Sequence, residues 1–517
     1  MKTIPEPLPD DLNLLKQLLK DCSLELERSY AEIEGLKTRI SQLLAQLYGK
    51  TSEHKKNLPQ PEGFDEPDST ESDPDPAPEA ETAELEEQAA DSEASEPPIP
   101  KPKQKSRKLP DYLEREEMLY DLSTEAQICD CGHPMHQLGF EELEQLKYVK
   151  ERLEVLVHRR AKYGCRSCET KVKTAPMPKQ AIPKSIASAE LLAKIMVAKY
   201  EDHLPLYRQQ AIFERIGIEM SRSTFNHWVF KCAELLSPLV SALKQQILAS
   251  SYIRCDETTL NVLSRQSERT HCYMWVYCKA MPHEAGAVVY EYHPSRSQEV
   301  ADALLANFKG YLQTDGYQGY NRLKSQTTIT GLGCWAHVRR KFFQILKSSP
   351  NLGKAKMALS YIDKLYKTEH RAKQLKLEFD QVKALRQQES VPVLNQFHQW
   401  LIKTKEGALP KSPLGQALSY ALNQWDTLTV YCQEGYLDID NNANERLIKP
   451  FVCGRKNWLF NGNDKGAQAS AIIYSLIQSC KLNGVNTQDY LTWVLKEYPN
   501  RITDDTPELY LPQHFKN

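Results

Sequence analysis

The stretch YIRCDETTLNV at residues 252–262 decides the fold of this chain. Its β-branched and aromatic residues are typical of a β-strand, and an acidic residue, Asp256, stands at its middle. An acid among strand residues needs either a partner or a face exposed to solvent. We therefore take this segment as the first strand of a sheet and Asp256 as a candidate site residue.

The segments that follow extend this strand into a sheet. The pattern predicts two more strands, an amphipathic helix and a short strand, at residues 271–279, 287–292, 297–308 and 311–314. The short strand ends at Asp315, although an Asp-Gly pair is also an ordinary turn signal. This order of elements is the opening of a ribonuclease-H-like mixed α/β core. In that arrangement Asp256 and Asp315 lie on adjacent strands.

A third carboxylate stands in LDIDNNANERLIKPFVCGRKNWLFN at residues 437–461. Glu445 falls on the opening turn of a predicted helix. The cations that follow it, and that we expect to bind DNA phosphates, include Arg446, Arg455 and Lys456. The alternative for Glu445 is a capping arrangement, in which Asn442 caps the helix and Glu445 reaches back to it.

Three gathered carboxylates suit a pair of magnesium ions. Two Mg²⁺ ions about 3.5–4 Å apart can activate a water or a 3′ hydroxyl and stabilise the leaving oxygen at phosphorus. Carboxylate oxygens are the ligands that such hard cations prefer, and they offset the charge of the ions. Asp256, Asp315 and Glu445 are therefore the candidate catalytic and metal-binding residues.

The motif GCWAHVRRKFF at residues 333–343 adds basic side chains just after a predicted strand at 327–331. His337, Arg339 and Arg340 either contact the scissile phosphate of DNA or form a structural network that holds the carboxylates in place. The residues by themselves favour neither interpretation.

Length and charge bound the class of protein. A chain of 517 residues is too long for one core, so we expect several domains. The net charge is -2, but residues 61–100 hold 15 acidic and no basic residues, and setting them aside leaves +13 for the rest. The folded parts are thus basic, which permits a polyanionic partner.

The compartment is predicted from two missing signals and from the cysteine pattern. There is no long apolar run and no signal segment at Met1, and most of the 13 Cys stand singly, as reduced thiols do. We therefore expect a soluble cytoplasmic protein with no membrane partner.

Two close cysteine pairs predict a structural Zn²⁺ site. Its ligands are Cys129, Cys131, Cys165 and Cys168. A strand-like stretch at 148–163 leads into the second pair. The first pair encloses a single residue, so His133 or His136 is an alternative ligand, and four unrelated reduced cysteines are the remaining interpretation.

The amino-terminal region carries an oligomerisation signal. Apolar residues recur in steps of four and three over residues 15–47, which predicts a coiled coil and hence a homo-oligomer. Residues 61–100 are rich in Pro and acids and predict a disordered linker, followed by a basic run at 101–108 that we interpret as a solvated tether.

A helical region predicts DNA binding. Residues 188–248 have the pattern of a run of helices, and 206–229 are similar to a helix-turn-helix. Its second helix would present Arg222 and Asn226 to a major groove. A plain helical hairpin fits the same pattern equally well.

These motifs together resemble, nearly end to end, transposases of the insertion-sequence-66 family. The resemblance rests on the heptad segment, the two Cys pairs and several motifs: LYGKTSEH (47–54), KYEDHLPLYRQQ (199–210), CDETTLNVL (255–263), TDGYQGY (314–320), GCWAHVRRKFF (333–343) and DNNANERLIKPFVCGRKNWLF (440–460). It implies that Asp256, Asp315 and Glu445 are a DDE catalytic triad that uses Mg²⁺. The departure is the first Cys pair, which encloses one residue where the family has two.

The resemblance also implies partners and a reaction. The expected enzyme cuts and joins double-stranded DNA at the terminal inverted repeats of its own insertion sequence and inserts the ends into target DNA. Small accessory proteins encoded by the same mobile element are further expected partners. The expected setting is the bacterial cytoplasm, at the nucleoid when DNA is bound.

The predicted organisation is a multidomain α+β chain. Its segments are a coiled coil (1–54), a disordered acidic linker (55–110), a zinc-binding domain (111–182), a helical DNA-binding region (183–248), the first part of the catalytic core (249–347), a helical insertion (348–434), the Glu-bearing part of the core (435–485) and a carboxyl-terminal segment (486–517).

Two rival functions remain open from the sequence. One is a non-catalytic dimeric zinc and helix-turn-helix repressor, which would bind DNA and be indifferent to the three carboxylates. The other is a ribonuclease-H-like nuclease, which needs neither strand joining nor paired ends. The long amino-terminal binding region favours the transposase over the nuclease.

Overall fold

The structure is a computed structural model, and it describes residues 153–164, 172–263, 271–349, 352–501 and 506–516, with a few isolated helical positions before residue 40. The four predicted zinc ligands, the acidic linker and nearly all of the predicted coiled coil lie outside the described residues. The chain divides into two compact units, one formed by residues 1–69 and 160–517 and the other by residues 70–159.

The expected strand at residues 148–163 is wrong over most of its described length. Residues 153–161 have no regular secondary structure, and their side chains are exposed. Only β1 (Lys162–Gly164) forms, and it pairs in antiparallel fashion with β2 (Val172–Thr174). Alternating apolar residues make a strand only where a sheet covers one face, and this segment has no such cover among the described residues.

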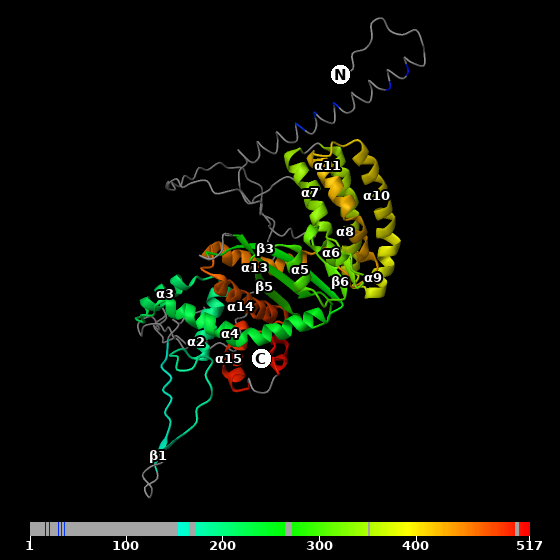
Figure 1. Cartoon of the computed structure of the whole chain (residues 1–517). Coiled ribbons are helices and arrows are strands. Elements are labelled where there is room, and N and C mark those ends of the chain that lie inside the picture. Colours follow the sequence, from blue (N-terminus) through cyan, green and yellow to red (C-terminus); the bar gives the residue numbers. More distant parts are fainter. Residues whose placement is uncertain are drawn as a thin grey trace, which may run out of the picture. The chain divides into compact units, whose positions relative to one another are not determined.

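A mixed five-stranded sheet lies at the centre of the larger unit (Figure 1). Its strands are β3 (Tyr252–Asn261), β4 (His271–Lys279), β5 (Val288–His293), β6 (Gly310–Gln313) and β7 (Ile329–Leu332), in the spatial order β5-β4-β3-β6-β7. Pairing is antiparallel from β5 to β3 and parallel from β3 to β7. The predicted order of three strands, a helix and a strand is present, with α5 (Gln298–Leu304) as the helix.

The register between β3 and β6 determines where the acids lie. Arg254 pairs with Gln313 at the last registered position. Two residues further along each strand come Asp256 and Asp315, so continuing the parallel register sets one acid beside the other. Because side chains alternate between faces, Asp256 projects from the face that Arg254 occupies, while Asp315 stands two residues beyond the end of β6.

The edge strand β5 is covered by α14 (Asp464–Leu482). The backbone N–H groups of Tyr290 and Val288 donate to the Oγ atoms of Ser475 and Ser479, at 2.8 and 3.2 Å. An edge strand otherwise leaves such donors unpaired. The packed helices α2 (Ala189–Tyr200), α4 (Arg222–Leu248) and α15 (Thr487–Arg501) complete a hydrophobic core with β3, β4 and β5.

The expected run of helices at 188–248 is present. After α3 (Leu206–Arg215), the chain turns at Gly217, whose φ of +83° favours glycine, and α4 begins after Ser221. The Ser221 hydroxyl accepts a hydrogen bond from the Thr224 N–H and so caps the start of α4. Two helices joined by a turn are thus present, as both the helix-turn-helix and the plain hairpin interpretations require, and the later turns of the 27-residue α4 pack in the core.

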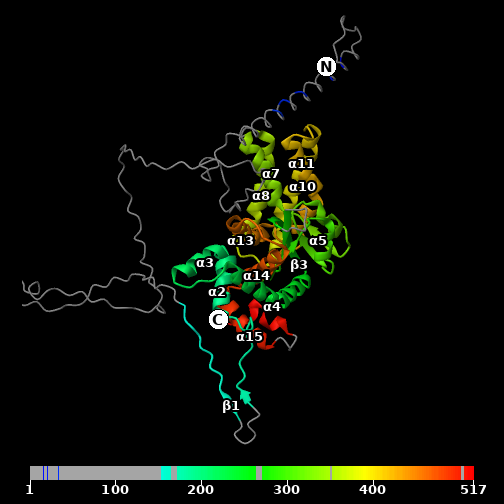
Figure 2. The same cartoon turned by 60° about the vertical axis from the view of Figure 1, so that its left-hand side comes forward.

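A second hydrophobic core belongs to the helices between residues 335 and 429. Its main members are α7 (Trp335–Ser348), α8 (Gly353–Gln374), α10 (Val391–Glu406) and α11 (Pro413–Asn423), which lie side by side in Figures 1 and 2, with the short α9 (Phe379–Leu385) and α12 (Trp425–Thr429). Phe397 stacks between Tyr361 and Trp335, at ring-centre distances of 4.9 and 6.0 Å. Trp335 is fully buried in this core, and residues 353–429 are largely helical, as predicted.

The chain then returns to the sheet through α13 (Asn442–Trp458), which contacts β3 and β4. None of the helices in the described ranges combines the length and the apolar character needed to cross a lipid bilayer.

A substitution at Gly310 tests the pairing of β3 with β6. Its φ is +132°, and a Cβ at this position would lie 2.2 Å from the Ser251 carbonyl oxygen. We expect Gly310→Ala to lower the free energy of unfolding by about 3 kcal/mol, measured from the urea midpoint of tryptophan fluorescence. Gly353→Ala is the matched control, because its Cβ would meet nothing within 4 Å. Equal midpoints for the two variants would contradict the assigned β3–β6 pairing.

Candidate active site

Asp256 and Asp315 form the centre of the candidate site. Asp256 is half-buried on β3, and its Oδ1 accepts a hydrogen bond from the Glu257 N–H at 2.8 Å. Burial raises the pKa of Asp256 well above its ordinary value, and the negative charges of Asp315 and Glu445 are among those that raise it further. Asp315 and Glu445 therefore both lie within electrostatic reach of Asp256.

A tight turn fixes Asp315. Its Oδ1 accepts a hydrogen bond from the Tyr317 N–H at 2.9 Å, so the acid closes the loop that follows β6. Lys324 on α6 (Asn321–Lys324) approaches the Asp315 backbone carbonyl at 3.4 Å. Burial lowers the pKa of Lys324 to about 8, while the charge of Asp315 opposes that shift. The turn interpretation of Asp315 is thus correct, and its place in a catalytic site stays a prediction.

Glu445 enters the site from the first turn of α13. The helix begins after Asn441, and Asn441 makes no side-chain capping bond. The alternative in which Asn442 caps and Glu445 reaches back is therefore absent, since the Glu445 carboxylate points to α7 instead. Its Oε2 accepts a hydrogen bond from Arg340 Nη2 at 3.2 Å. The partial positive charge of the helix start also favours a carboxylate there.

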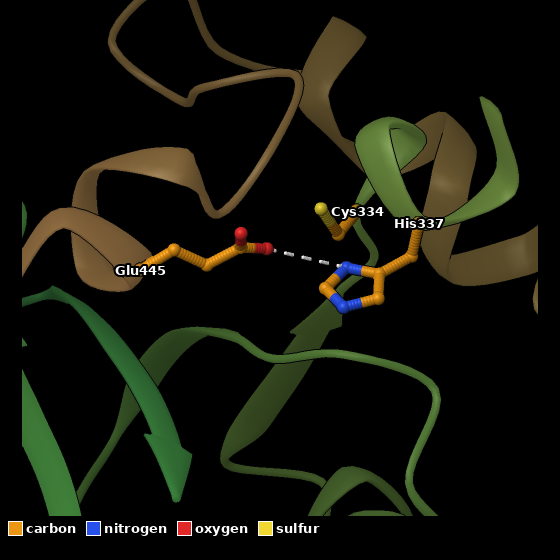
Figure 3. A group of neighbouring side chains, drawn as sticks. All are labelled: Cys334, His337 and Glu445. Carbon is orange, nitrogen blue, oxygen red and sulfur yellow. Dashed lines mark ion pairs between the residues drawn. The ribbon is translucent and has the colours of Figure 1, made fainter. Parts of the chain in front are cut away.

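The first turn of α7 faces Glu445. His337 Nδ1 lies 3.7 Å from Glu445 Oε1, and Figure 3 shows the two groups pointing toward each other. Cys334, just before α7, accepts a hydrogen bond from the Asn441 N–H at 3.2 Å. Burial lowers the pKa of His337 despite the opposing charge of Glu445, so the imidazole is neutral at neutral pH. For His337 and Arg340 the geometry favours contact with the Glu445 carboxylate.

Side chains that the sequence did not single out anchor the segment before α13. Gln313 Oε1 accepts hydrogen bonds from the Tyr252 hydroxyl at 2.6 Å and from Arg254 Nε at 3.2 Å. Gln313 Nε2 donates to the Asp438 carbonyl at 2.9 Å, and Arg254 forms an ion pair with the Asp438 carboxylate. Asp438 belongs to the quoted stretch 437–461, but nothing in the sequence indicates its partner, 184 residues away.

Glu257 is a further buried acid that the sequence did not identify. Its side chain is fully buried, forms an ion pair with Arg296 and accepts a hydrogen bond from the Tyr320 hydroxyl. The guanidinium of Arg296 lies 3.8 Å from the centre of the Tyr317 ring. This network holds the loop that carries Asp315. The only sequence signal was the position of Glu257 directly after Asp256.

The predicted DNA-binding cations separate into two groups. Arg446 and Lys456 are exposed on α13, as expected of phosphate contacts. Arg455 instead donates to Thr259 Oγ1 at 2.7 Å and so fastens α13 to β3. Arg339 is 8 % exposed and lies 3.9 Å from Asp363, with its guanidinium near the Phe343 ring. For Arg339 the structure favours the network interpretation over contact with DNA.

Arg222 and Asn226 are exposed on the first turns of α4, while Phe225 and Trp228 turn inward. The exposed side chains make the first turns of α4 accessible to a binding partner. Whether that partner is DNA stays a prediction.

The carboxylate cluster fits divalent cations. The pKa of Asp256 is raised because negative charges are crowded together in a buried place, and a divalent ion would relieve that crowding. Glu445 Oε1 is buried and, within the described part of the chain, has no hydrogen-bond partner. Asp256, Asp315 and Glu445 are the residues that would hold such ions.

The fold and the site together define a class: a mixed α/β protein with an acidic, cation-binding type of centre edged by basic side chains. The comparison with known families is more specific. The model described as "Transposase IS66 family" matches residues 184–469. The chain therefore belongs to the IS66 transposase family.

Three further family models match other parts of the chain. The zinc-finger binding domain of transposase IS66 matches residues 126–169, the IS66 C-terminal element matches 475–510, and a model described as "Transposase C of IS166 homeodomain" matches 35–118. The first of these supports Zn²⁺ binding in the segment that holds the two cysteine pairs.

Similar chains come from Sinorhizobium fredii (strain NBRC 101917 / NGR234). The uncharacterized protein y4jD is 34% identical over 422 residues, which cover 79% of this chain and 81% of that protein. The uncharacterized protein y4qI is 32% identical over 78% of this chain and 76% of that protein.

Without bound ions, the negative charge of Asp256 should lower the stability of the folded protein at neutral pH. Its folded pKa lies above the ordinary 3.8, so the native state holds this proton more tightly than the unfolded state does. The stability that this contributes is fully present below about pH 3.8 and is lost as the pH rises through the folded pKa. Without divalent ions, Asp256→Asn should therefore melt above the wild type at neutral pH.

Thermal melts across pH, with EDTA or Mg²⁺, check this expectation. The gap between Asp256→Asn and the wild type should widen as pH rises in EDTA and shrink in Mg²⁺, because the ion binds the native wild type. Asp202→Asn, at an exposed position, is the control and should follow the wild type. A lower melting temperature for Asp256→Asn at neutral pH would count against the crowded site.

Proposed function

We propose that this protein is a DDE transposase with a ribonuclease-H-like catalytic core, which cuts and joins DNA at the terminal inverted repeats of its own insertion sequence. The single observation that carries the proposal is that the charges of Asp315 and Glu445 both act on the buried carboxyl of Asp256. The three residues come from three separate elements, β3, the loop after β6 and α13. Membership of the IS66 transposase family supports the reaction.

The three carboxylates would hold the metal ions. When bound, two Mg²⁺ ions supply an activated water or 3′ hydroxyl and stabilise the leaving oxygen at phosphorus. Asp256 and Asp315 are fixed by the sheet register and by the Tyr317 turn, so their oxygens are positioned before any ion arrives. Arg340 holds one oxygen of Glu445, which leaves the other directed into the site.

Basic side chains around the site would bind the DNA backbone. Arg446 and Lys456 are exposed on the helix that carries Glu445, so a strand bound along α13 would pass the carboxylates. The same exposure at the start of α4 supports a role for Arg222 and Asn226 in reading the repeat. The zinc module would add to this recognition.

The remaining parts of the proposal concern assembly. A coiled coil within residues 1–54 would pair subunits so that one complex holds two element ends. Small accessory proteins of the same element would join it, and the reaction would take place in the cytoplasm of a bacterium, at the nucleoid.

Glu445→Gln tests the catalytic assignment. The variant keeps the shape of the side chain but lacks the charge that holds an ion, so we expect it to abolish nicking while leaving repeat binding nearly intact. The assay is Mg²⁺-dependent nicking and strand transfer on a labelled duplex that carries the terminal repeat, beside an EDTA sample. Glu406→Gln, at an exposed position on α10, should keep full activity. Full cleavage by Glu445→Gln would overturn the triad, and specific binding without cleavage by the wild type would favour a repressor.

Arg222→Ala and Asn226→Ala test the recognition helix. If these side chains read base edges, each substitution should cost about 1–3 kcal/mol of binding, or roughly five- to 150-fold in Kd. Gel-shift titrations of repeat and scrambled duplexes at one fixed salt concentration measure the loss. Lys405→Ala, at an exposed position on α10, is the control for a lost surface charge. Unchanged affinity in both variants would favour the plain helical hairpin.

A further inference from the structure

Two buried polar atoms face each other beside the triad without a hydrogen bond. They are His337 Nδ1 and Glu445 Oε1, which are 3.7 Å apart, and in the described part of the chain neither has a hydrogen-bond partner. Buried polar atoms are nearly always paired, so this pair needs an explanation. Figure 3 shows both groups directed into the same space between α7 and α13.

The separation of these atoms suits one shared ion. Divalent ions lie about 2.0–2.2 Å from nitrogen and oxygen ligands, so two ligands of one ion are roughly 3–4 Å apart. The measured 3.7 Å falls within that span. A direct hydrogen bond would need the atoms to approach to about 2.9 Å. His337 also lies within electrostatic reach of Asp315, so it borders two of the three carboxylates.

Cys334 is the third residue of the group, and its role differs. The ligand atoms of Cys334, His337 and Glu445 all lie within 4.8 Å of one another. The Cys334 sulfur, however, already accepts the Asn441 N–H at 3.2 Å, whereas His337 Nδ1 has no hydrogen-bond partner among the described residues. Cys334 therefore joins the starts of α7 and α13, and His337 is the available ligand.

We propose that His337 Nδ1 supplies a nitrogen ligand to the divalent-ion site that Glu445 completes. The inference rests on the proposed function and refines it, since His337 then acts on the ion and not on DNA. One ion would then have a nitrogen ligand from His337 and an oxygen ligand from Glu445, while Asp256 and Asp315 would offer oxygen ligands alone. An imidazole ligand raises affinity for Mn²⁺ and later transition ions relative to Mg²⁺.

Pulsed electron paramagnetic resonance of bound Mn²⁺ tests the proposal directly. The sample is the full chain with its zinc module loaded, without DNA, titrated with one to two equivalents of Mn²⁺. A directly bound imidazole gives a characteristic ¹⁴N coupling. We expect this coupling in the wild type and its loss in His337→Asn, whose amide presents oxygen near the former Nδ1 position. Mn²⁺ should also bind roughly tenfold or more weakly to that variant. His370→Asn, exposed on α8, should match the wild type.

The outcomes separate this inference from the proposed function. Bound Mn²⁺ without ¹⁴N coupling in the wild type, together with Mg²⁺-dependent nicking, would overturn the ligand role of His337 and leave the transposase proposal standing. Coupling that persists in His337→Asn would overturn the assignment as well. A wild type that neither binds Mn²⁺ nor nicks repeat DNA would overturn both.

Discussion

The parallel pairing of β3 with β6 is the constraint on which the site depends. Parallel strands cannot be joined by a tight turn, so the chain must leave β3, build β4 and β5, and return through α5 before β6 can form. The return fixes the register at Arg254 and Gln313, and two residues later it brings Asp256 and Asp315 together. A shift of one residue would turn one acid to the opposite face.

The pairing of β3 with β6 also brings negative charges together, and nearby arginines balance part of that charge. Burial raises the pKa of Asp256, and repulsion by the neighbouring acids raises it further. Arg340 balances part of the charge at Glu445, and Arg296 balances Glu257. Residual repulsion at the centre is expected of a site built to hold cations, because the same charges that destabilise the empty site attract the ions.

The helices between residues 353 and 429 make up most of the segment that separates Asp315 from Glu445 along the chain. Glu445 stands 130 positions after Asp315 along the chain, yet it must reach the same site. The intervening segment packs with α7 in a second hydrophobic core around Phe397, and Tyr252 of β3 and Leu332 of β7 join that core and so connect it to the sheet. The Trp335 N–H donates to the Ile439 carbonyl at 3.2 Å, and the Cys334 sulfur accepts the Asn441 N–H. These two contacts return the chain to the start of α13 beside α7.

The sequence alone determined the elements of the core and the three acids. Periodicity indicated the strands, the helix between them and the helical run after residue 348, because alternation and helical spacing are local properties. It failed at residues 153–161, where alternation lacked a sheet to pack on. What only the tertiary structure decided are the partners: Arg455 binds Thr259, Arg339 turns to Asp363, and His337 faces Glu445. A charged side chain has the same appearance in sequence whether it meets solvent, DNA or a buried acid, and packing over long chain separations alone distinguishes these cases.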